Sequence, residues 1–367
     1  MWLRYIQVIV TNREDPSKQI IFDKHKIDFE IRSTIGWAAD TATITLTNLN
    51  VDEMKFLQSK EFGEMDIEVR GGYRDKYDYG GIDRSTPIGG VQVRPDLDGT
   101  TTSQIANKDT LFSGVITNAI GFKQPPEHIF KMFCLSKAAF NGTTFAQMRD
   151  IPNGATLNDA IVSMCQDYGY GTVSQYGLRS EDLETKLPLG RVFHDTFLNE
   201  FTALLGEHNL SFRITTSEIQ IFPDTYADLD AVNRMAKDRE PLKLDANEVI
   251  GTVLAGITSL SLSTFLNAYV QPGMVLDVTP LLGEELLING VINVQNNSQK
   301  TLNYSESVFR YAMSDKYLIK EVVHHGSTHE LTFQTSLSCI IGGSTAMGAG
   351  EVAWQEMYRN SGMALDG

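Results

Sequence analysis

Apolar and polar residues alternate along much of the first 70 residues of the chain. The alternating apolar positions are Ile6, Val8 and Val10, then Ile27, Phe29 and Ile31, then Ile44 and Leu46, and then Met65, Ile67 and Val69. A period of two is typical of strands that bury one face. The pattern therefore predicts a β domain, with one or two helical turns between residues 51 and 60, where Met54, Phe56 and Leu57 lie at helical spacing.

Residues 74–110 interrupt this pattern with paired glycines, aspartates and a run of threonines. Such a composition is typical of a long, exposed loop, so we expect an insertion into the first β domain. Strand character returns at residues 111–116 and again at residues 129–135, and Pro125 and Pro126 lie between these two segments. The first β domain is therefore predicted to span residues 1–124.

The chain becomes helical after this point. Thr156 can cap a helix together with Asp159, and the apolar residues that follow recur every three or four positions until Gly169. Asp195 is expected to open a second helix, which ends at Gly206. A hairpin is predicted next, because Phe212 and Ile214 are separated from Ile219 and Ile221 by the polar turn 215–218. Residues 125–245 are thus predicted to form a mixed helix and hairpin region.

A second β domain is predicted at residues 246–341. Its expected strands are residues 274–278, 286–294, 307–313, 317–323 and 331–337. Residues 342–367 begin as a glycine-rich linker and end in a short helix with Trp354, Met357 and Tyr358 at helical spacing. The predicted fold class is α+β but mainly β, with two tube-like antiparallel β-barrel domains flanking the mixed region.

Composition and charge narrow the function classes. The 367 residues suffice for about two to four domains. A net charge of −15 disfavours tight DNA binding, because affinity for phosphates depends on Lys and Arg. The sequence offers neither a membrane span nor the apolar block of a signal peptide, so we expect synthesis in a cytoplasm. Cys134, Cys165 and Cys339 are widely spaced, which indicates buried thiols rather than disulfides or a zinc site.

The two predicted β domains share a sequence pattern. In the first, residues 63–69 precede residues 111–118, and in the second, residues 273–278 precede residues 287–293. In both, a strand that follows a glycine leads to a strand with a Gly-Val-Ile core. This agreement indicates an internal duplication. Two unrelated small barrels that share strand chemistry are the alternative.

Several of these segments resemble a known family. The segments are Asp40-Thr41-Ala42-Thr43-Ile44-Thr45-Leu46-Thr47-Asn48-Leu49, residues 67–73, Leu111-Phe112-Ser113-Gly114-Val115-Ile116, Tyr269-Val270-Gln271-Pro272-Gly273, residues 317–326 and residues 332–335. Their order and spacing are similar to the opening and late β domains of tailed-bacteriophage baseplate hub proteins, which adapt the tail tube to the spike. The 74–110 loop is longer than this family leads us to expect, and no spike-like β-helix repeat follows.

The resemblance implies a structural protein of the virion, assembled in the host cytoplasm and placed in the tail baseplate. It implies a homotrimer in which two tube-like domains per chain give six around an axial channel. Such a ring can join a hexameric tail tube protein to a trimeric tip spike protein. Other baseplate proteins are further expected partners, and DNA is expected only in passage through the channel during ejection.

Chemical motifs in the sequence favour structural roles. His324, His325 and His329 invite a zinc hypothesis, but adjacent residues of a strand point to opposite faces, which favours a structural hairpin. Asp96 and Asp98 give only a fragment of a calcium loop. His194 and Asp195 fit helix capping, and no phosphate-binding glycine loop follows a strand. We therefore expect no catalytic residue, no cofactor and no metal, and a protein that is not an enzyme.

Trp354, Met357 and Tyr358 are the candidate partner-binding residues, since aromatic side chains on a tethered helix are good anchors for a groove. Packing of this helix onto the chain's own surface is the alternative. Two other functions stay open at this point. One is a peptidoglycan hydrolase of the tail tip, which needs two carboxylates in one cleft. The other is the hub of a phage-derived secretion or bacteriocin particle.

Overall fold

The computed structural model describes most of the chain. The described residues are 3–36, 39–58, 63–74, 109–144, 149–167, 173–187, 190–215, 218–224, 230–244, 246–255, 259–278 and 316–341. The predicted 74–110 loop, the predicted strands at 286–294 and 307–313 and the segment 342–367 lie almost wholly outside these ranges.

The first β region, called module 1 below, forms from residues 3–136. Its elements are β1 (Leu3–Asn12), β2 (Gln19–Phe22), β3 (Lys26–Thr34), β4 (Thr41–Thr47), α1 (Val51–Gln58), β5 (Met65–Arg74), β6 (Thr110–Gln124) and β7 (Glu127–Ser136). The strands are neighbours in the order β3-β4-β7-β6-β5-β1-β2, and each pair is antiparallel. The predicted period-two strands and the short helix are therefore confirmed.

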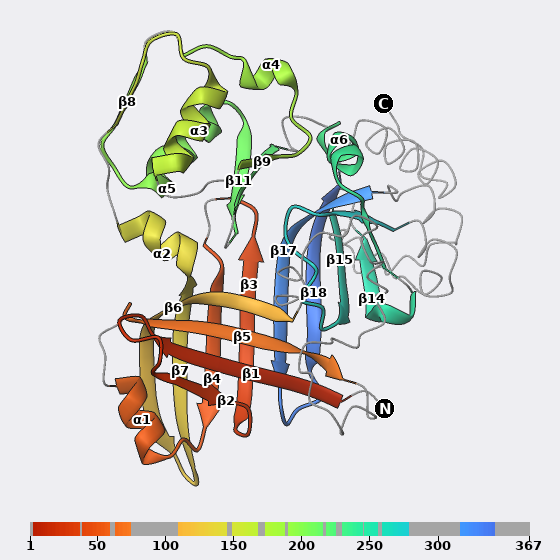
Figure 1. The fold of residues 1–367 in the computed structure, drawn as a ribbon. Coiled ribbons are helices and arrows are strands. Elements are labelled where there is room, and N and C mark those ends of the chain that lie inside the picture. The colour runs from red at the N-terminus through yellow and green to blue at the C-terminus, as the bar shows by residue number, and fades with distance from the viewer. Residues whose placement is uncertain are drawn as a thin grey trace, which may run out of the picture.

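Module 1 has two layers. In Figure 1, β1 and β5 cross in front of β3 and β4. The alternating apolar residues of both layers meet in one core, where Val8 and Val69 of one layer and Ile44 and Ile31 of the other are fully buried. This arrangement follows from the alternation, because each strand has one apolar face and the two layers bury these faces against each other.

Strand β6 belongs to both layers. Its first half pairs with β5 up to Val115, and a register shift between Ile116 and Asn118 follows. Its second half pairs with β7 as far as Gln124. A bulge bends a strand and increases its twist, so it allows β6 to pass from one layer to the other.

The second β region, called module 2 below, spans residues 242–341. Its strands are β13 (Leu242–Lys243), β14 (Val249–Ala255), β15 (Ser259–Phe265), β16 (Val275–Asp277), β17 (Lys316–Ser327) and β18 (Phe333–Ile341), with a 3-10 turn η2 (Ala246–Glu248). They are neighbours in the order β14-β15-β18-β17-β16, and β13 joins β16 in parallel. Its buried core includes Leu260, Leu276, Tyr317 and Ile319.

The two modules repeat one pairing scheme. The order β3-β4-β7-β6-β5 of module 1 corresponds to β14-β15-β18-β17-β16 of module 2. The hairpins match residue by residue, including the register shift. In module 1 Ile116 faces Cys134 before the shift and Asn118 faces Phe133 after it, and in module 2 Ile319 faces Cys339 before the shift and Glu321 faces Ser338 after it.

Two glycines support the same equivalence. Gly63 precedes β5 with φ +93° and Gly273 precedes β16 with φ +88°, a conformation that favours glycine. The Gly63 N–H donates to the carbonyl of Ile116 at 2.9 Å, and the Gly273 N–H donates to the carbonyl of Ile319 at 2.9 Å. These acceptors occupy equivalent places, so the pairing supports an internal duplication. The strand equivalent to β6 is β17, whereas the sequence pattern had assigned this place to residues 287–293, which lie outside the described residues.

A strand pair joins the two modules. Strand β3 pairs with β17 over Asp28–Thr34 and Glu321–Ser327, so that the described strands of both modules form one 13-stranded sheet. Tube-like modules are thus linked edge to edge, and among the described residues the pairing runs through both modules rather than closing on each. The reason is that β3, the outer strand of module 1, has its open edge filled by β17.

The mixed region lies over one end of both modules (Figure 1). Its elements are α2 (Lys137–Thr144), β8 (Arg149–Ile151), α3 (Leu157–Asp167), β9 (Val173–Gln175), α4 (Ser180–Leu183), β10 (Arg191–Phe193), α5 (Phe197–Glu207), β11 (Leu210–Ile214), β12 (Ile219–Pro223) and α6 (Ala231–Asp238). The Thr156 and Asp159 capping box forms as predicted, with both hydrogen bonds at 3.1 Å. The predicted hairpin is β11 with β12.

Helix α5 begins two residues later than predicted. Thr196 is its N-cap, while Asp195 accepts hydrogen bonds from the Thr196 backbone N–H and from the Asn199 side chain. These two bonds lower the pKa of the Asp195 carboxyl, the backbone bond being the larger cause. Asp195 therefore precedes the N-cap and contacts the start of α5 through these two bonds, whereas the sequence had assigned the cap to the His194-Asp195 pair.

Candidate assembly surface

One long layer of strands crosses the molecule. It consists of eight strands in the order β6 (second half), β7, β4, β3, β17, β18, β15 and β14. Its inner face packs into the cores of both modules. Over its five central strands, β4, β3, β17, β18 and β15, its outer face includes the following partly or fully exposed residues: Asp28, Glu30, Arg32, Thr41, Thr43, Thr45, Ser259, Ser261, Ser263, Glu321, Val323, His325, Gln334, Ser336 and Ser338.

Small hydroxyl residues and charged residues dominate the outer face over these five strands. Arg32 and Glu321 form an ion pair of 3.2 Å across the β3–β17 junction, and Ser263 and Ser336 share a hydrogen bond of 3.0 Å. A shallow groove of about 260 Å³ runs over β15, β18 and β17, with Leu254 at its border. Hydroxyl and charged side chains of this kind favour contact with water.

The layer ends in two open edges. At one end, the second half of β6 has β7 on one side, and within the described ranges no strand pairs with its other side beyond Val115. At the other end, β14 pairs only with β15 within those ranges. Edge strands expose unpaired backbone N–H and C=O groups, which makes them sites for pairing with another chain.

A buried polar cluster fixes the mixed region on both modules. Arg213 of β11 is 8% exposed and donates to the side-chain oxygen of Gln271 at 3.1 Å and to the Pro272 carbonyl at 3.4 Å. The Arg213 guanidinium also lies 3.5 Å from the Asp40 carboxylate, between β3 and β4. Burial lowers the pKa of Arg213 and raises the pKa of Asp40, while the mutual attraction of the two charges opposes both shifts. This cluster connects the mixed region with both modules.

The three histidines do not converge. His324 is buried and its Nδ1 lies 2.9 Å from the Thr335 hydroxyl, whereas His325 next to it lies on the outer face. His329 contacts Thr328 in the β17–β18 turn. Burial, with smaller contributions from Arg213 and His325, lowers the pKa of His324 to about 3. His324 is therefore a neutral core residue at pH 7.

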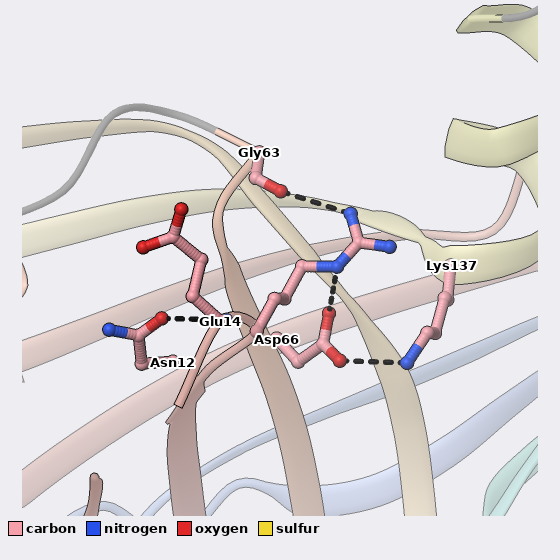
Figure 2. A network of polar contacts seen from close by, with 6 residues as sticks. Asn12, Glu14, Gly63, Asp66 and Lys137 are labelled. Atoms are coloured by element: carbon pink, nitrogen blue, oxygen red, sulfur yellow. Dashed lines mark hydrogen bonds and ion pairs between the residues drawn. The ribbon is translucent and has the colours of Figure 1, made fainter. Parts of the chain in front are cut away.

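A second polar cluster joins β1, β5 and α2. The Asp66 carboxylate lies 3.2 Å from the Arg13 guanidinium and 2.7 Å from the Lys137 ammonium. Figure 2 shows the contact between Asp66 and Lys137. Arg13 also donates to the Gly63 carbonyl at 3.0 Å. Because Lys137 begins α2, this cluster anchors the start of the mixed region at the corner of module 1.

The cysteines match the expectation of buried thiols. Cys134, Cys165 and Cys339 are free and buried, and burial raises the pKa of each to about 12. They are therefore unreactive at neutral pH.

Two further properties concern the described part of the chain. It brings together no group of three His, Cys, Asp or Glu side chains that could hold a metal ion. Its helices are all too short or too polar to cross a membrane.

Several residues singled out in the sequence lie outside the described ranges. These are Trp354, Met357 and Tyr358, together with Asp96 and Asp98 of the 74–110 loop. Partner binding through Trp354, Met357 and Tyr358 stays a proposal. Conversely, the sequence analysis missed Arg213, Asp40 and the two open edges. A weak signal for Arg213 existed, since it is a charged residue between the apolar Phe212 and Ile214 of a predicted strand.

Comparison of the sequence with known proteins gives no match. No protein-family model matches the chain, and no curated protein is significantly similar to it.

Comparison of the structure does find similar proteins. A tail protein from Neisseria meningitidis MC58 superimposes with a TM-score of 0.51 at 9% identity, covering 94% of this chain and 99% of that one. The c3393 protein of Escherichia coli, a component of the type VI secretion system, gives a TM-score of 0.47 at 13% identity over 87% of this chain and 74% of that one. The 43 kDa tail protein of prophage MuSo2 from Shewanella oneidensis gives 0.45 at 8% identity, over 91% and 96%.

The chain thus has the fold of the Neisseria tail protein over nearly its whole length. The resemblance to tail proteins, first seen in the sequence, is confirmed at the level of the fold.

Proposed function

We propose that this chain is a structural hub of a phage tail. Three copies form a ring around an axial channel, which joins a hexameric tail tube to a trimeric spike. The ring contacts other baseplate proteins, and DNA passes through it during ejection. In the virion the protein belongs to the tail baseplate.

The observation that carries this proposal is the pair of equivalent modules in one continuous sheet. A trimer with two equivalent modules per chain has six similar modules, which can meet a hexameric partner. Its three chains are identical, so the same ring has the three-fold symmetry of a trimeric partner. A monomeric enzyme has no need for such a repeat. The fold shared with the Neisseria tail protein supports the same role.

The outer face of the eight-strand layer supports a channel function. Its hydroxyl side chains are hydrated, and its acidic residues include Asp28, Glu30 and Glu321. Together with the net charge of −15, this composition disfavours tight binding of phosphate groups. We assign this face to the channel wall, because DNA must slide along it without being retained.

A structural role also fits the carboxylates of the described residues better than a hydrolase does. A raised pKa marks a candidate general acid, and Asp40 is the one described carboxyl for which a raised pKa is resolved. Asp40 lies against Arg213 in the core rather than beside a second carboxylate in a cleft. We therefore propose that the protein is not an enzyme.

The mass of the purified particle tests the proposal. Light scattering on the full chain at increasing concentration is expected to show a species of three times 40.8 kDa. A stable monomer or a two-fold dimer over the whole range would contradict the ring, since neither provides six modules.

A further inference from the structure

The junction between the two modules inside one chain serves as a template for the contact between chains. Strand β3, the outer strand of module 1, fills the open edge of β17 in module 2. By the equivalence of the modules, β14 corresponds to β3 and β6 corresponds to β17. Among the described strands there is therefore one used edge pair, β3 with β17, and one unused pair of the same kind, β14 with β6.

The register of the used pair predicts the register of the unused pair. His325 lies four residues after Glu321, and Phe122 lies four residues after Asn118, so His325 and Phe122 occupy equivalent positions. In β17 the edge that β3 fills begins at Glu321, directly after the register shift. In β6 the corresponding edge begins after Val115, where the pairing with β5 ends.

The residue of β14 that is equivalent to Glu30 of β3 can be found by following directly paired residues from strand to strand across the sheet. In module 1 the row runs from Phe133 through Thr43 to Glu30. In module 2 the equivalent row runs from Ser338 through Ser261 to Leu254. Leu254 therefore occupies the place of Glu30.

Within the chain, Glu30 faces His325. The equivalent contact between two chains brings Leu254 of one copy opposite Phe122 of the next. These are two of the large apolar side chains that are exposed in the single chain, at 55% and 46%. Ile120, on the same side of β6 two residues before Phe122, is 48% exposed and is a diagonal neighbour of Leu254 in this register.

We propose that β14 of one copy of this chain pairs antiparallel with the end of β6 (Thr110–Gln124) in the next copy, with Leu254 opposite Phe122. The pairing fills both open edges and buries the three apolar side chains in one contact. In the equivalent contact within the chain, polar Glu30 and His325 take the places of Leu254 and Phe122, while Val323 takes the place of Ile120.

The contact is heterologous, because it uses a different edge of each partner. Head-to-tail contacts of this kind close into a ring when the rotation allows it. With three copies, as the proposed function on which this inference rests requires, three layers of eight strands would form one closed sheet. The β3–β17 junctions within chains and the β14–β6 junctions between chains would then alternate around the ring.

Cysteine cross-linking tests the predicted register on the full chain. Directly opposite residues in antiparallel strands have Cβ atoms about 4.5–5.5 Å apart, which permits a disulfide after small adjustments. The double variant Phe122→Cys/Leu254→Cys, oxidised mildly and run on a non-reducing gel, is expected to give bands of two and three chains and none larger. The native cysteines are buried and do not interfere.

Matched variants separate this contact from other ones. Each single variant is expected to stay uncross-linked, and mixing the two single variants is expected to give dimers only. The control Val192→Cys/Leu254→Cys places the first thiol on β10 of the mixed region, where Val192 is similarly exposed at 59%. It is expected to give no cross-linked band.

The outcomes distinguish this inference from the proposed function. A trimer in light scattering without cross-linking of the double variant would overturn the β14–β6 contact and leave the trimeric hub standing. Disulfide dimers of Phe122→Cys alone would also overturn it, since they require a face-to-face contact. A cross-linked series that ends at another number of chains would support the contact and contradict the trimer. A monomer without cross-linking would contradict both.

Discussion

Replacing Asp40 with asparagine is expected to lower the free energy of unfolding by about 3–5 kcal/mol, the usual cost of breaking a buried ion pair. The substitution leaves the Arg213 guanidinium buried without its main counter-charge, since the carboxylate of Glu218 acts on it more weakly than that of Asp40. Neutral Gln271 and the Pro272 carbonyl still accept hydrogen bonds from it, but neither balances its charge. Urea denaturation followed by fluorescence or circular dichroism measures the difference.

A double variant provides the control for this effect. Asp40→Asn combined with Arg213→Met removes both charges and keeps much of the volume, so it is expected to recover a large part of the lost stability. If Asp40→Asn alone changed the free energy of unfolding by less than about 1 kcal/mol, Arg213 would not depend on Asp40, and the ion pair would not connect the mixed region to module 1.

Stability is also expected to fall steeply in acid because of His324. Its pKa is about 3 in the folded chain and about 6.5 in an unfolded one, so the unfolded chain binds more protons between these values. The free energy of unfolding therefore decreases as the pH is lowered from 6.5 to 3, by about 4 kcal/mol from this residue. Above pH 6.5 the contribution of His324 is constant.

The variant His324→Asn isolates this contribution. Asparagine can place a polar atom near the position of Nδ1 and keep the contact with the Thr335 hydroxyl, but it does not titrate. Stability curves of the two proteins, measured by urea denaturation at several pH values, are expected to converge as the pH falls. Parallel curves would show that His324 does not remain neutral in the folded chain. Other titrating groups, including Asp40, are present in both proteins and cancel in the comparison.

The local elements were predictable because their signals are local. The strand alternation around Ile44 depends on side chains a few residues apart, and so does the capping of α3 by Thr156. Hydrogen bonds and buried faces of this kind form within one element or one hairpin. Sequence reasoning therefore found the mainly β fold.

The assembly surface could not be predicted in the same way. The pairing of Glu30 with His325 joins positions almost 300 residues apart, and nothing in either strand alone specifies it. The repeat was recognised from a Gly-Val-Ile motif, which common β composition also produces, so it led to residues 287–293 rather than to β17. Only the pairing of Ile319 with Cys339, which matches that of Ile116 with Cys134, identifies β17 as the equivalent strand.

The sequence contains a signal for the exposed apolar residues Ile120 and Phe122 that the sequence prediction did not include. Ile120 and Phe122 continue the alternation beyond the predicted end of their strand at residue 116. Alternating apolar residues that no described segment of the same chain covers indicate a contact with another molecule. Leu254 has no comparable signal, because its position at the open edge depends on the bulge between Ile250 and Leu254.

Electron microscopy of the oligomer at a resolution that separates strands tests the ring most directly. Three chains are expected to form six similar modules around a channel, with β14 of each chain against β6 of the next and the hydroxyl-rich face lining the channel. Subunits whose β14 and β6 edges both remain open to solvent, or a particle without a central channel, would contradict the proposed assembly.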